Sequence, residues 1–235
     1  MNTTQNKIHV KTITGTDIEC ILGGKPQDWR DNHEMIHALA EKLGIANIRF
    51  LLPQHGTEVV NFQDTTPKPI AADGMVLEKG QSVGIKPAGC PTVIMRTASS
   101  DKIIVGHCSR INMLDTPVRH IIHSMLQKIF TDAEPLHVSI VLSAKPSDMI
   151  FSPENPKYGA KNQTIWDRLL QLGIREHPHW HLDLPQVIKM LILESTNNLP
   201  GVCVHHDNDD DLCFPDGDWW LHPEKGRNLV IVRNT

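Results

Sequence analysis

Three residues with reactive side chains lie where a predicted strand meets a loop. His55 is in the segment 53–57, Cys90 is in the segment 88–91, and His107 ends a predicted strand. Strand ends on a rigid scaffold commonly carry reactive groups. The gaps of 35 and 17 residues between them are not local ligand spacings. One hypothesis is therefore a site shared by the two imidazoles and the thiol, and the simpler one is two ordinary histidines and a buried structural thiol.

The elements that position these residues are short β-rich runs followed by amphipathic helices. Mixed strands and helices without regular βαβ alternation predict an α+β fold, or a layered α/β sandwich, built as one domain over residues 1–235. Asp115 and Asp183 are typical helix caps, and each has a proline close behind it. We predict strands over residues 7–13, 17–22, 48–52, 58–62, 82–86, 92–97, 102–107, 136–142, 202–205 and 229–233, helices over 28–43, 115–129, 164–172 and 183–194, and loops over 145–157 and 207–218.

The composition excludes several classes of protein. The 235 residues are 40% hydrophobic and 21% charged, as in ordinary globular proteins, and no apolar run is long enough to cross a membrane. Net charge is −4 and only 5% of the residues are aromatic, so nucleic acid is not an expected partner. Five cysteines without CxxC spacing, and no apolar leader at the start, predict reduced thiols in the cytoplasm.

Two other histidine- or acid-rich segments could bind metal. His177, His179 and His181 alternate along one stretch, which could hold a metal ion or be an exposed loop. The acidic run 207–211 begins like a calcium loop, but its sixth position is Leu212 and its twelfth is Asp218, so we interpret it as a solvated loop.

The segments around His55, Cys90 and His107 also carry a family resemblance. Four segments resemble motifs of the YfiH-like family, whose members are often labelled multicopper polyphenol oxidoreductase or laccase-domain proteins. The motifs are, in order, QxHG..V, DA..T, ADC.P and HaGWrG, and the matching segments are Pro53–Val59, Ala72–Val76, Ala88–Pro91 and His107–Arg110. The resemblance extends from about residue 23 onward. It implies a YfiH-like fold, similar to that of a toxin deamidase that uses a Cys–His pair.

The resemblance further implies that His55, Cys90 and His107 hold one metal ion, zinc or alternatively copper, with a fourth position left open. It implies a metal-dependent enzyme that acts on purine nucleosides by phosphorolysis or adenosine deamination, with phosphate as a further ligand and Arg110 as a candidate anion anchor. We do not expect laccase chemistry, because three matched ligands cannot supply several copper centres. The oligomeric state does not follow from the sequence.

Departures from the family motifs keep two alternatives open. The aspartate expected before Cys90 is Gly89, and HaGWrG has become His107-Cys108-Ser109-Arg110-Ile111-Asn112, which removes the tryptophan and both glycines. One alternative is therefore a non-enzymatic metal-binding member of the family. The other is a metal-free hydrolase in which Cys90 is the nucleophile and His107 or His55 its base. Asp73 and Asp115 are the acidic residues that could replace the missing carboxylate.

Overall fold

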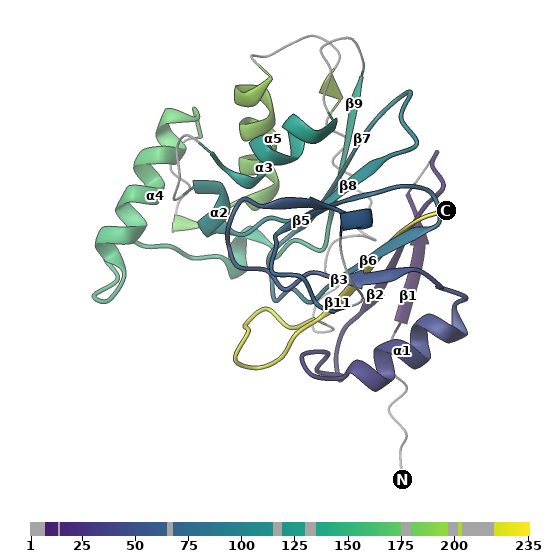
Figure 1. The fold of residues 1–235 in the computed structure, drawn as a ribbon. Helices are drawn as coiled ribbons and strands as arrows, with labels where there is room; N and C mark the ends of the chain where they lie inside the picture. The colour runs from purple at the N-terminus through teal and green to yellow at the C-terminus, as the bar shows by residue number, and fades with distance from the viewer. Residues whose placement is uncertain are drawn as a thin grey trace.

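Two mixed β-sheets stack face to face, with helices on both outer sides (Figure 1). The computed structural model describes residues 8–13, 15–64, 68–114, 119–129, 135–174, 180–196, 202–203 and 219–235. The five-stranded sheet has the order β1 (Ile8–Thr12), β2 (Ile18–Gly23), β11 (Leu229–Asn234), β6 (Gln81–Ile85), β3 (Ile48–Phe50). The six-stranded sheet has the order β10 (Val202–Cys203), β9 (Leu136–Val141), β7 (Thr92–Thr97), β8 (Ile103–His107), β5 (Gly74–Leu77), β4 (Val59–Asn61).

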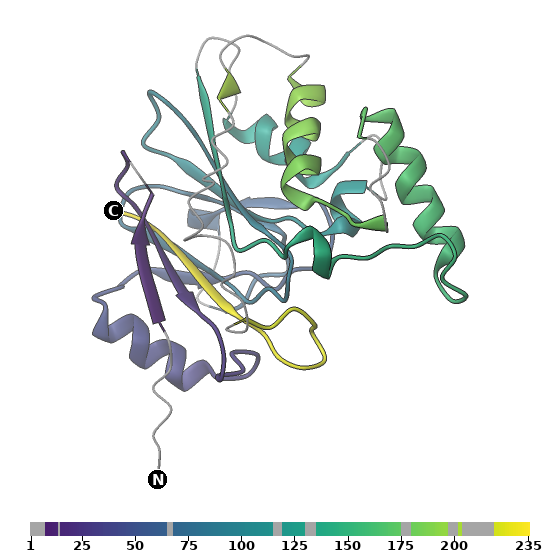
Figure 2. The same ribbon diagram turned by 180° about the vertical axis from the view of Figure 1, so that it is seen from behind.

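The helices form the two outer layers. Helix α1 (His33–Lys42) covers the five-stranded sheet, and α3 (Ile121–Ile129) and α5 (Leu184–Ser195) pack on the other side of the six-stranded sheet, as the view from behind also shows (Figure 2). The short helix α2 (Arg110–Leu114) follows β8, and α4 (Gly159–Gln171) lies at the outer edge of this layer (Figure 1). No helix in the described segments is long and apolar enough to cross a membrane.

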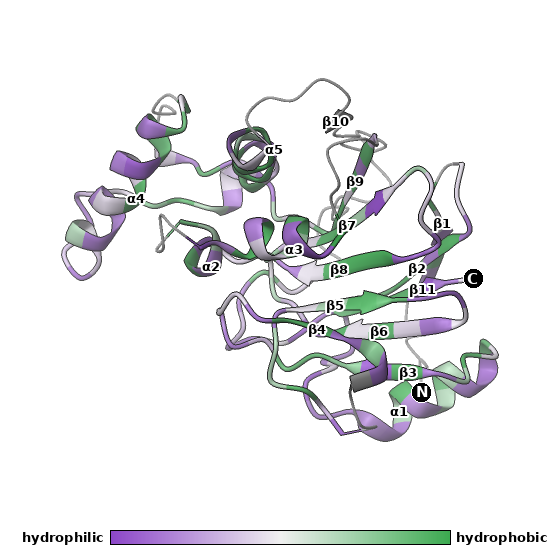
Figure 3. Ribbon diagram, turned by 45° about the horizontal axis from the view of Figure 1, so that its top comes forward, coloured by the Kyte–Doolittle hydropathy of each residue, from purple (hydrophilic) through white to green (hydrophobic). Residues whose placement is uncertain are grey.

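Three apolar clusters hold the four layers together, one at each interface. On β11, Leu229 and Ile231 face α1, whereas Val230 and Val232 face the other sheet. Ile94 of β7 belongs to the cluster that lies between the two sheets. This alternation follows from the two-residue period of a strand. Strands buried on both faces must be apolar at almost every position, and the hydropathy colouring shows β5 and β8 green along most of their length (Figure 3).

The predicted fold class is confirmed: the chain is a layered sandwich of mixed sheets and helices. The structure also contains two elements that we did not predict, the four-residue strand β5 and the helix α2. Both are too short to show a hydrophobic period of their own. The start of the predicted helix 115–129 and the last two residues of the predicted strand 202–205 lie outside the described residues.

Two helix boundaries differ from the prediction for local reasons. The first helix begins at His33 rather than at residue 28, because Asp28 Oδ1 accepts the backbone N–H groups of Arg30 and Arg227 and keeps this segment out of the helix. Helix α4 begins at Gly159 rather than at residue 164, just after a turn that is fixed by Asn155. The predicted cap at Asp183 is confirmed, since its Oδ1 accepts the N–H of Gln186 at 3.1 Å.

Candidate functional site

Strand register brings three polar side chains to one end of the six-stranded sheet. Gly74 of β5 pairs with Gly106 of β8, and Thr92 of β7 pairs with His107. Asp73 precedes Gly74 and Cys90 lies two residues before Thr92, so both lie beside the end of β8. Backbone hydrogen bonds fix this end: the His107 N–H donates to the Asp73 carbonyl oxygen at 2.7 Å.

His107 is the centre of a buried polar group. Its Nδ1 lies 3.1 Å from Asp73 Oδ1, and the two side chains are only 2% and 1% exposed. Burial alone would lower the pKa of His107, but hydrogen bonds to Asp73 and Cys90 outweigh it and raise that pKa to about 9. Because Asp73 occupies Nδ1, the ring nitrogen left for Cys90 is Nε2. The half-buried thiol of Cys90 and the carboxylate of Asp73 therefore lie on opposite sides of one imidazole.

His55 faces the same group from the loop between β3 and β4. Its ring centre is 5.4 Å from that of His107, and its Nδ1 is 2.9 Å from the hydroxyl oxygen of Ser109. Its φ of 56° is in the left-handed region, which few non-glycine residues adopt. Burial, followed by the positive charge of His107, lowers the pKa of His55. Its imidazole is therefore neutral at pH 7.

The chemistry of these side chains fits a zinc ion. Two imidazoles that share a tetrahedral zinc at bond lengths of about 2.0–2.1 Å must have ring centres about 5 Å apart, close to the 5.4 Å observed for His55 and His107. A carboxylate on the second nitrogen, as Asp73 provides for His107, is the usual partner of a metal-binding histidine. Within the described part of the chain, however, no group of three or more His, Cys, Asp or Glu side chains is arranged so that it could hold a metal ion.

Arg110, the candidate anion anchor, is the first residue of α2. Its guanidinium stacks on the Phe151 ring at 4.9 Å from the ring centre, and one buried nitrogen, Nη1, has no hydrogen-bond partner. Its positive charge contributes to the lowered pKa of His55, so it lies within electrostatic range of the site. It is not among the residues that line the cavity beside His55.

A cavity of about 220 Å³ lies directly against His55 and His107. Three cationic side chains line it, Arg30, Lys86 and Arg227, and they outnumber its one carboxylate, Asp31. The rest of the lining is Leu51, Leu52 and Pro53. Such a cavity favours a ligand that has an anionic group and a flat or apolar part.

The cavity cations are held in place by the backbone. Lys86 Nζ donates to the Arg30 carbonyl oxygen at 2.7 Å, and Arg227 donates to the Lys86 carbonyl oxygen at 3.4 Å. Burial lowers the pKa of Lys86. These three residues could not be recognised as site residues from the sequence, because they are isolated along it and only the fold brings them together.

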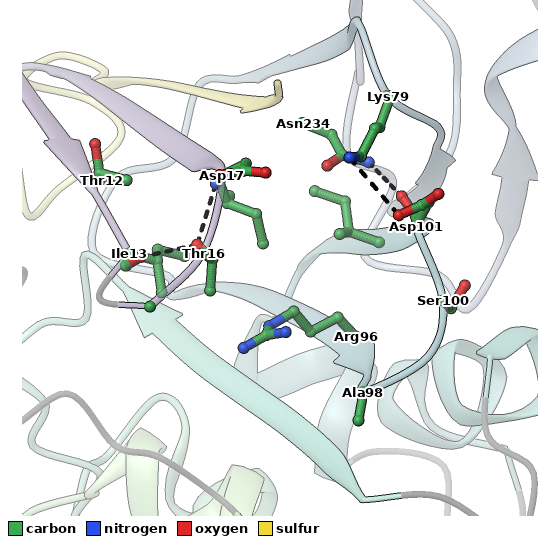
Figure 4. A pocket seen from close by; sticks show the side chains of 13 residues that line it. Thr12, Ile13, Thr16, Asp17, Lys79, Arg96, Ala98, Ser100, Asp101 and Asn234 are labelled. Carbon is green, nitrogen blue, oxygen red and sulfur yellow. Dashed lines mark hydrogen bonds and ion pairs between the residues drawn. The ribbon is translucent and has the colours of Figure 1, made fainter.

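A second cavity, of about 590 Å³, lies at the opposite ends of the strands (Figure 4). Thr12 at the end of β1, Ile103 at the start of β8 and Asn234 at the end of β11 line it. Its residues include an ion pair between Lys79 and Asp101 at 3.8 Å, and the described residues that line it include no His or Cys. This cavity is larger than the one beside His107, but it lacks reactive side chains.

Gly89 has a backbone conformation that disfavours any residue with a side chain. Its φ is +83°, and a Cβ added to it would be 3.1 Å from the backbone oxygen of Leu221. The loop before Cys90 is therefore built around a glycine. Asp73 supplies a carboxylate to the site from a neighbouring strand instead.

The other residues singled out in the sequence do not join the site. His181 pairs through an isolated bridge with Ile150, and it lines a small cavity of about 100 Å³ beside Trp166. His177, His179, Asp115 and the acidic run 207–211 lie outside the described residues.

The chain belongs to the family described as multi-copper polyphenol oxidoreductase laccase, whose sequence model matches residues 11–211. The suspected family is therefore confirmed. A search of curated proteins gave no match.

Solved structures show the same fold at low sequence identity. The Neisseria meningitidis protein NMB0706 (family model DUF152) has a TM-score of 0.67 at 12% identity, covering 96% of this chain and 98% of that chain. YlmD from Geobacillus stearothermophilus has a TM-score of 0.63 at 14% identity, and the hypothetical protein YfiH from Bacillus licheniformis has 0.63 at 13% identity; each match covers 92% of both chains. The YfiH-like fold that the resemblance implied is therefore confirmed.

Proposed function

We propose that this protein is a metal-dependent enzyme that cleaves purine nucleosides with inorganic phosphate, and that His55, Cys90 and His107 hold the metal ion. The observation that carries the proposal is the cationic cavity beside the two histidines. In phosphorolysis an oxygen of phosphate bonds to the ribose carbon as the glycosidic bond breaks, which yields ribose 1-phosphate and the free base. Arg30, Lys86 and Arg227 supply the positive charge that such an anionic reactant needs.

The chain's own residues prepare the site for this reaction. Asp73 can only accept hydrogen bonds when ionised, so it holds the Nδ1–H of His107 and leaves Nε2 directed to the site. The apolar side chains of Leu51 and Leu52 offer a surface for the flat base. Zinc, or copper as the alternative, would act as a Lewis acid when bound and polarise an oxygen of the reactants.

The free thiols support a reducing, cytoplasmic setting. Among the described residues Cys90 and Cys108 form no disulfide, and burial raises the pKa of Cys108 well above its usual value. We propose small molecules, a purine nucleoside and phosphate, as the partners of the site, rather than nucleic acid or membrane.

Metal content and thiol reactivity of the same preparation test the proposal. We expect about one zinc per chain and a slow reaction of Cys90 with a thiol reagent. Cys90→Ser and His107→Ala should each abolish the stoichiometric zinc, whereas Cys20→Ser, in the other sheet, should retain it. Full zinc content in both of the first two variants would show that the ligand assignment is wrong.

Turnover is tested with inosine and phosphate, by following the release of hypoxanthine and ribose 1-phosphate. We expect release that depends on phosphate. A protein that binds zinc but turns over no nucleoside would instead be the non-enzymatic alternative.

A second candidate, the metal-free hydrolase, is favoured by one specific observation. The Cys90 thiol, the His107 ring and the Asp73 carboxylate lie in series, as in cysteine hydrolases in which an acidic residue orients the base. A nucleophilic thiol must be free, whereas a ligand thiolate is occupied. A metal-free preparation in which Cys90 reacts rapidly with iodoacetamide would therefore favour the hydrolase over the metal enzyme.

A further inference from the structure

Two polar side chains stand where the resembled motif HaGWrG has glycine. These positions are Ser109 and Asn112, at the start of α2, and both side chains are almost fully buried, at 2% and 1% exposed. Buried polar side chains are costly unless they are hydrogen-bonded. The partners of these two therefore show what they do.

Ser109 and Asn112 first bind each other. The Ser109 N–H donates to Asn112 Oδ1 at 2.8 Å, and the Asn112 N–H donates to Ser109 Oγ at 3.3 Å. This is the reciprocal pattern of a capping box, which satisfies backbone groups at the start of a helix. If capping were their only role, neither side chain would need to contact a histidine.

Each of the two side chains also reaches one of the site histidines. Ser109 Oγ lies 2.9 Å from His55 Nδ1. Asn112 Nδ2 donates to the His107 carbonyl oxygen at 3.0 Å and to Asp73 Oδ1 at 3.3 Å, the same oxygen that holds the His107 ring. The hydrogen bonds therefore run without a break from His55 through Ser109, Asn112 and Asp73 to His107.

The two ends of this chain of hydrogen bonds differ in chemistry. The Asp73 carboxylate can only accept, so it fixes the proton of His107 on Nδ1. The Ser109 hydroxyl already accepts one N–H and has one hydrogen and one lone pair left, so it can pair with either tautomer of His55. Ser109 thus fixes the direction of the His55 ring while allowing its Nε2 to be free of a proton.

We propose that Ser109 and Asn112 are positioning residues that tie His55 and His107 into one hydrogen-bonded frame, so that both rings direct Nε2 to the same point. The inference rests on the proposed function, because a shared point matters only if the two rings act together. Outer partners of metal-binding histidines typically affect metal affinity by about 10–100-fold.

The test uses substitutions that separate positioning from capping. Ser109→Gly retains a residue type that is well tolerated at the start of a helix, but it removes the partner of His55. Ser109→Thr retains both the cap and the hydroxyl. Ser100→Gly is the matched control, because Ser100 Oγ also accepts a nearby backbone N–H, that of Lys102 at 3.0 Å, at the opposite end of β8.

Two measurements are made on each full-length variant. Zinc affinity is measured by competition with a chromophoric chelator. The ring nitrogens of His55 and His107 are observed by long-range ¹H–¹⁵N spectra of the metal-free protein, which report the tautomer of each ring. We expect Ser109→Gly to weaken zinc binding about 10–100-fold and to change the His55 ring signals, with the control at wild-type values and Ser109→Thr close to them.

The outcomes separate this inference from the proposed function. If the wild type binds no zinc but Ser109→Gly changes the His55 ring signals, the positioning role stands and the metal enzyme is wrong. If Ser109→Gly changes neither the ring signals nor any zinc affinity, the positioning role is wrong. Loss of affinity in Ser100→Gly equal to that in Ser109→Gly would also overturn it, because the effect would then follow from a general loss of rigidity.

Discussion

Replacement of Asp73 by asparagine should destabilise the fold by more than the loss of one hydrogen bond. Each carboxylate oxygen accepts two hydrogen bonds: Oδ1 from His107 and Asn112, at 3.1 and 3.3 Å, and Oδ2 from the backbone N–H groups of Gln54 and Gly56, at 3.0 and 2.8 Å. An asparagine has only one oxygen. Whichever way its amide is turned, an NH₂ group faces two donors, so two of the four hydrogen bonds are lost.

The magnitude follows from the charge and the burial. Hydrogen bonds to a charged group are worth about 1.5–3 kcal/mol each, so two of them amount to about 3–6 kcal/mol. Some of this stability is recovered if His107, no longer held in its charged form by Asp73, loses its Nδ1 proton and keeps the one on Nε2, because Nδ1 can then accept from the new amide. We therefore expect Asp73→Asn to lower the free energy of unfolding by about 3 kcal/mol. In that neutral form the remaining proton lies on Nε2, between His107 and Cys90, and should weaken zinc binding.

Urea unfolding of the metal-free protein at pH 7 measures the effect, with equal m-values required for the comparison. Asp101→Asn is the control, because the Asp101 side chain is 82% exposed and pairs loosely with Lys79 at 3.8 Å. We expect the control to change stability by less than about 0.5 kcal/mol. A loss below about 1 kcal/mol in Asp73→Asn would refute the argument that the carboxylate is needed as an acceptor on both sides.

The pH dependence gives a second check on the same pair. The folded pKa of His107, about 9, is above its ordinary value of 6.5, so its charge contributes stability that is fully present below pH 6.5 and is lost as pH rises through 9. The difference in stability between wild type and Asp73→Asn should therefore shrink over this range. A constant difference from pH 6.5 to 9 would mean that the His107 charge does not depend on Asp73.

Three further predictions concern other parts of the molecule. Burial lowers the pKa of His120 from 6.5 to about 4. As the pH falls, the unfolded chain therefore binds this proton before the folded protein does, and the free energy of unfolding should fall by up to about 3 kcal/mol between pH 6.5 and 4. His120→Gln should remove that part of the decline, as measured by urea unfolding. Gly23→Ala should cost about 1–3 kcal/mol of unfolding free energy, because the new methyl group would be 2.8 Å from the buried ring of Trp29; an unchanged melting temperature would contradict this packing argument. Arg227→Met should raise the KM for phosphate by about tenfold or more, with a smaller change in kcat. Arg233, which lies on β11 and pairs with Glu19, provides the control: Arg233→Met should leave the KM unchanged.

The strand and helix pattern could be predicted because it depends on local chemistry. The strand over 92–97 was predicted with its observed boundaries, and the predicted cap at Asp183 is present. Both signals come from short-range rules: side chains alternate along a strand, and a carboxylate accepts the N–H groups at a helix start. The strand β5 was missed because its four residues carry no period of their own and pair only with β8 and β4.

The types of the site residues came from the sequence, whereas their arrangement came from the fold. His55, Cys90 and His107 could be selected because reactive side chains stood at predicted strand ends in the order of a family motif. Asp73 was only one of two acidic candidates, since no spacing along the chain places a carboxylate on a given imidazole nitrogen.

Only the tertiary structure decided how these groups act on one another. Strand register places Asp73 against His107, and the start of α2 carries Ser109 to His55, across 54 positions of the sequence. The cationic cavity likewise joins residues that are far apart in the chain, such as Arg30 and Arg227. Side-chain chemistry is local and can be recognised in one dimension, but hydrogen bonds and summed charge depend on distances that exist only after the sheets have paired.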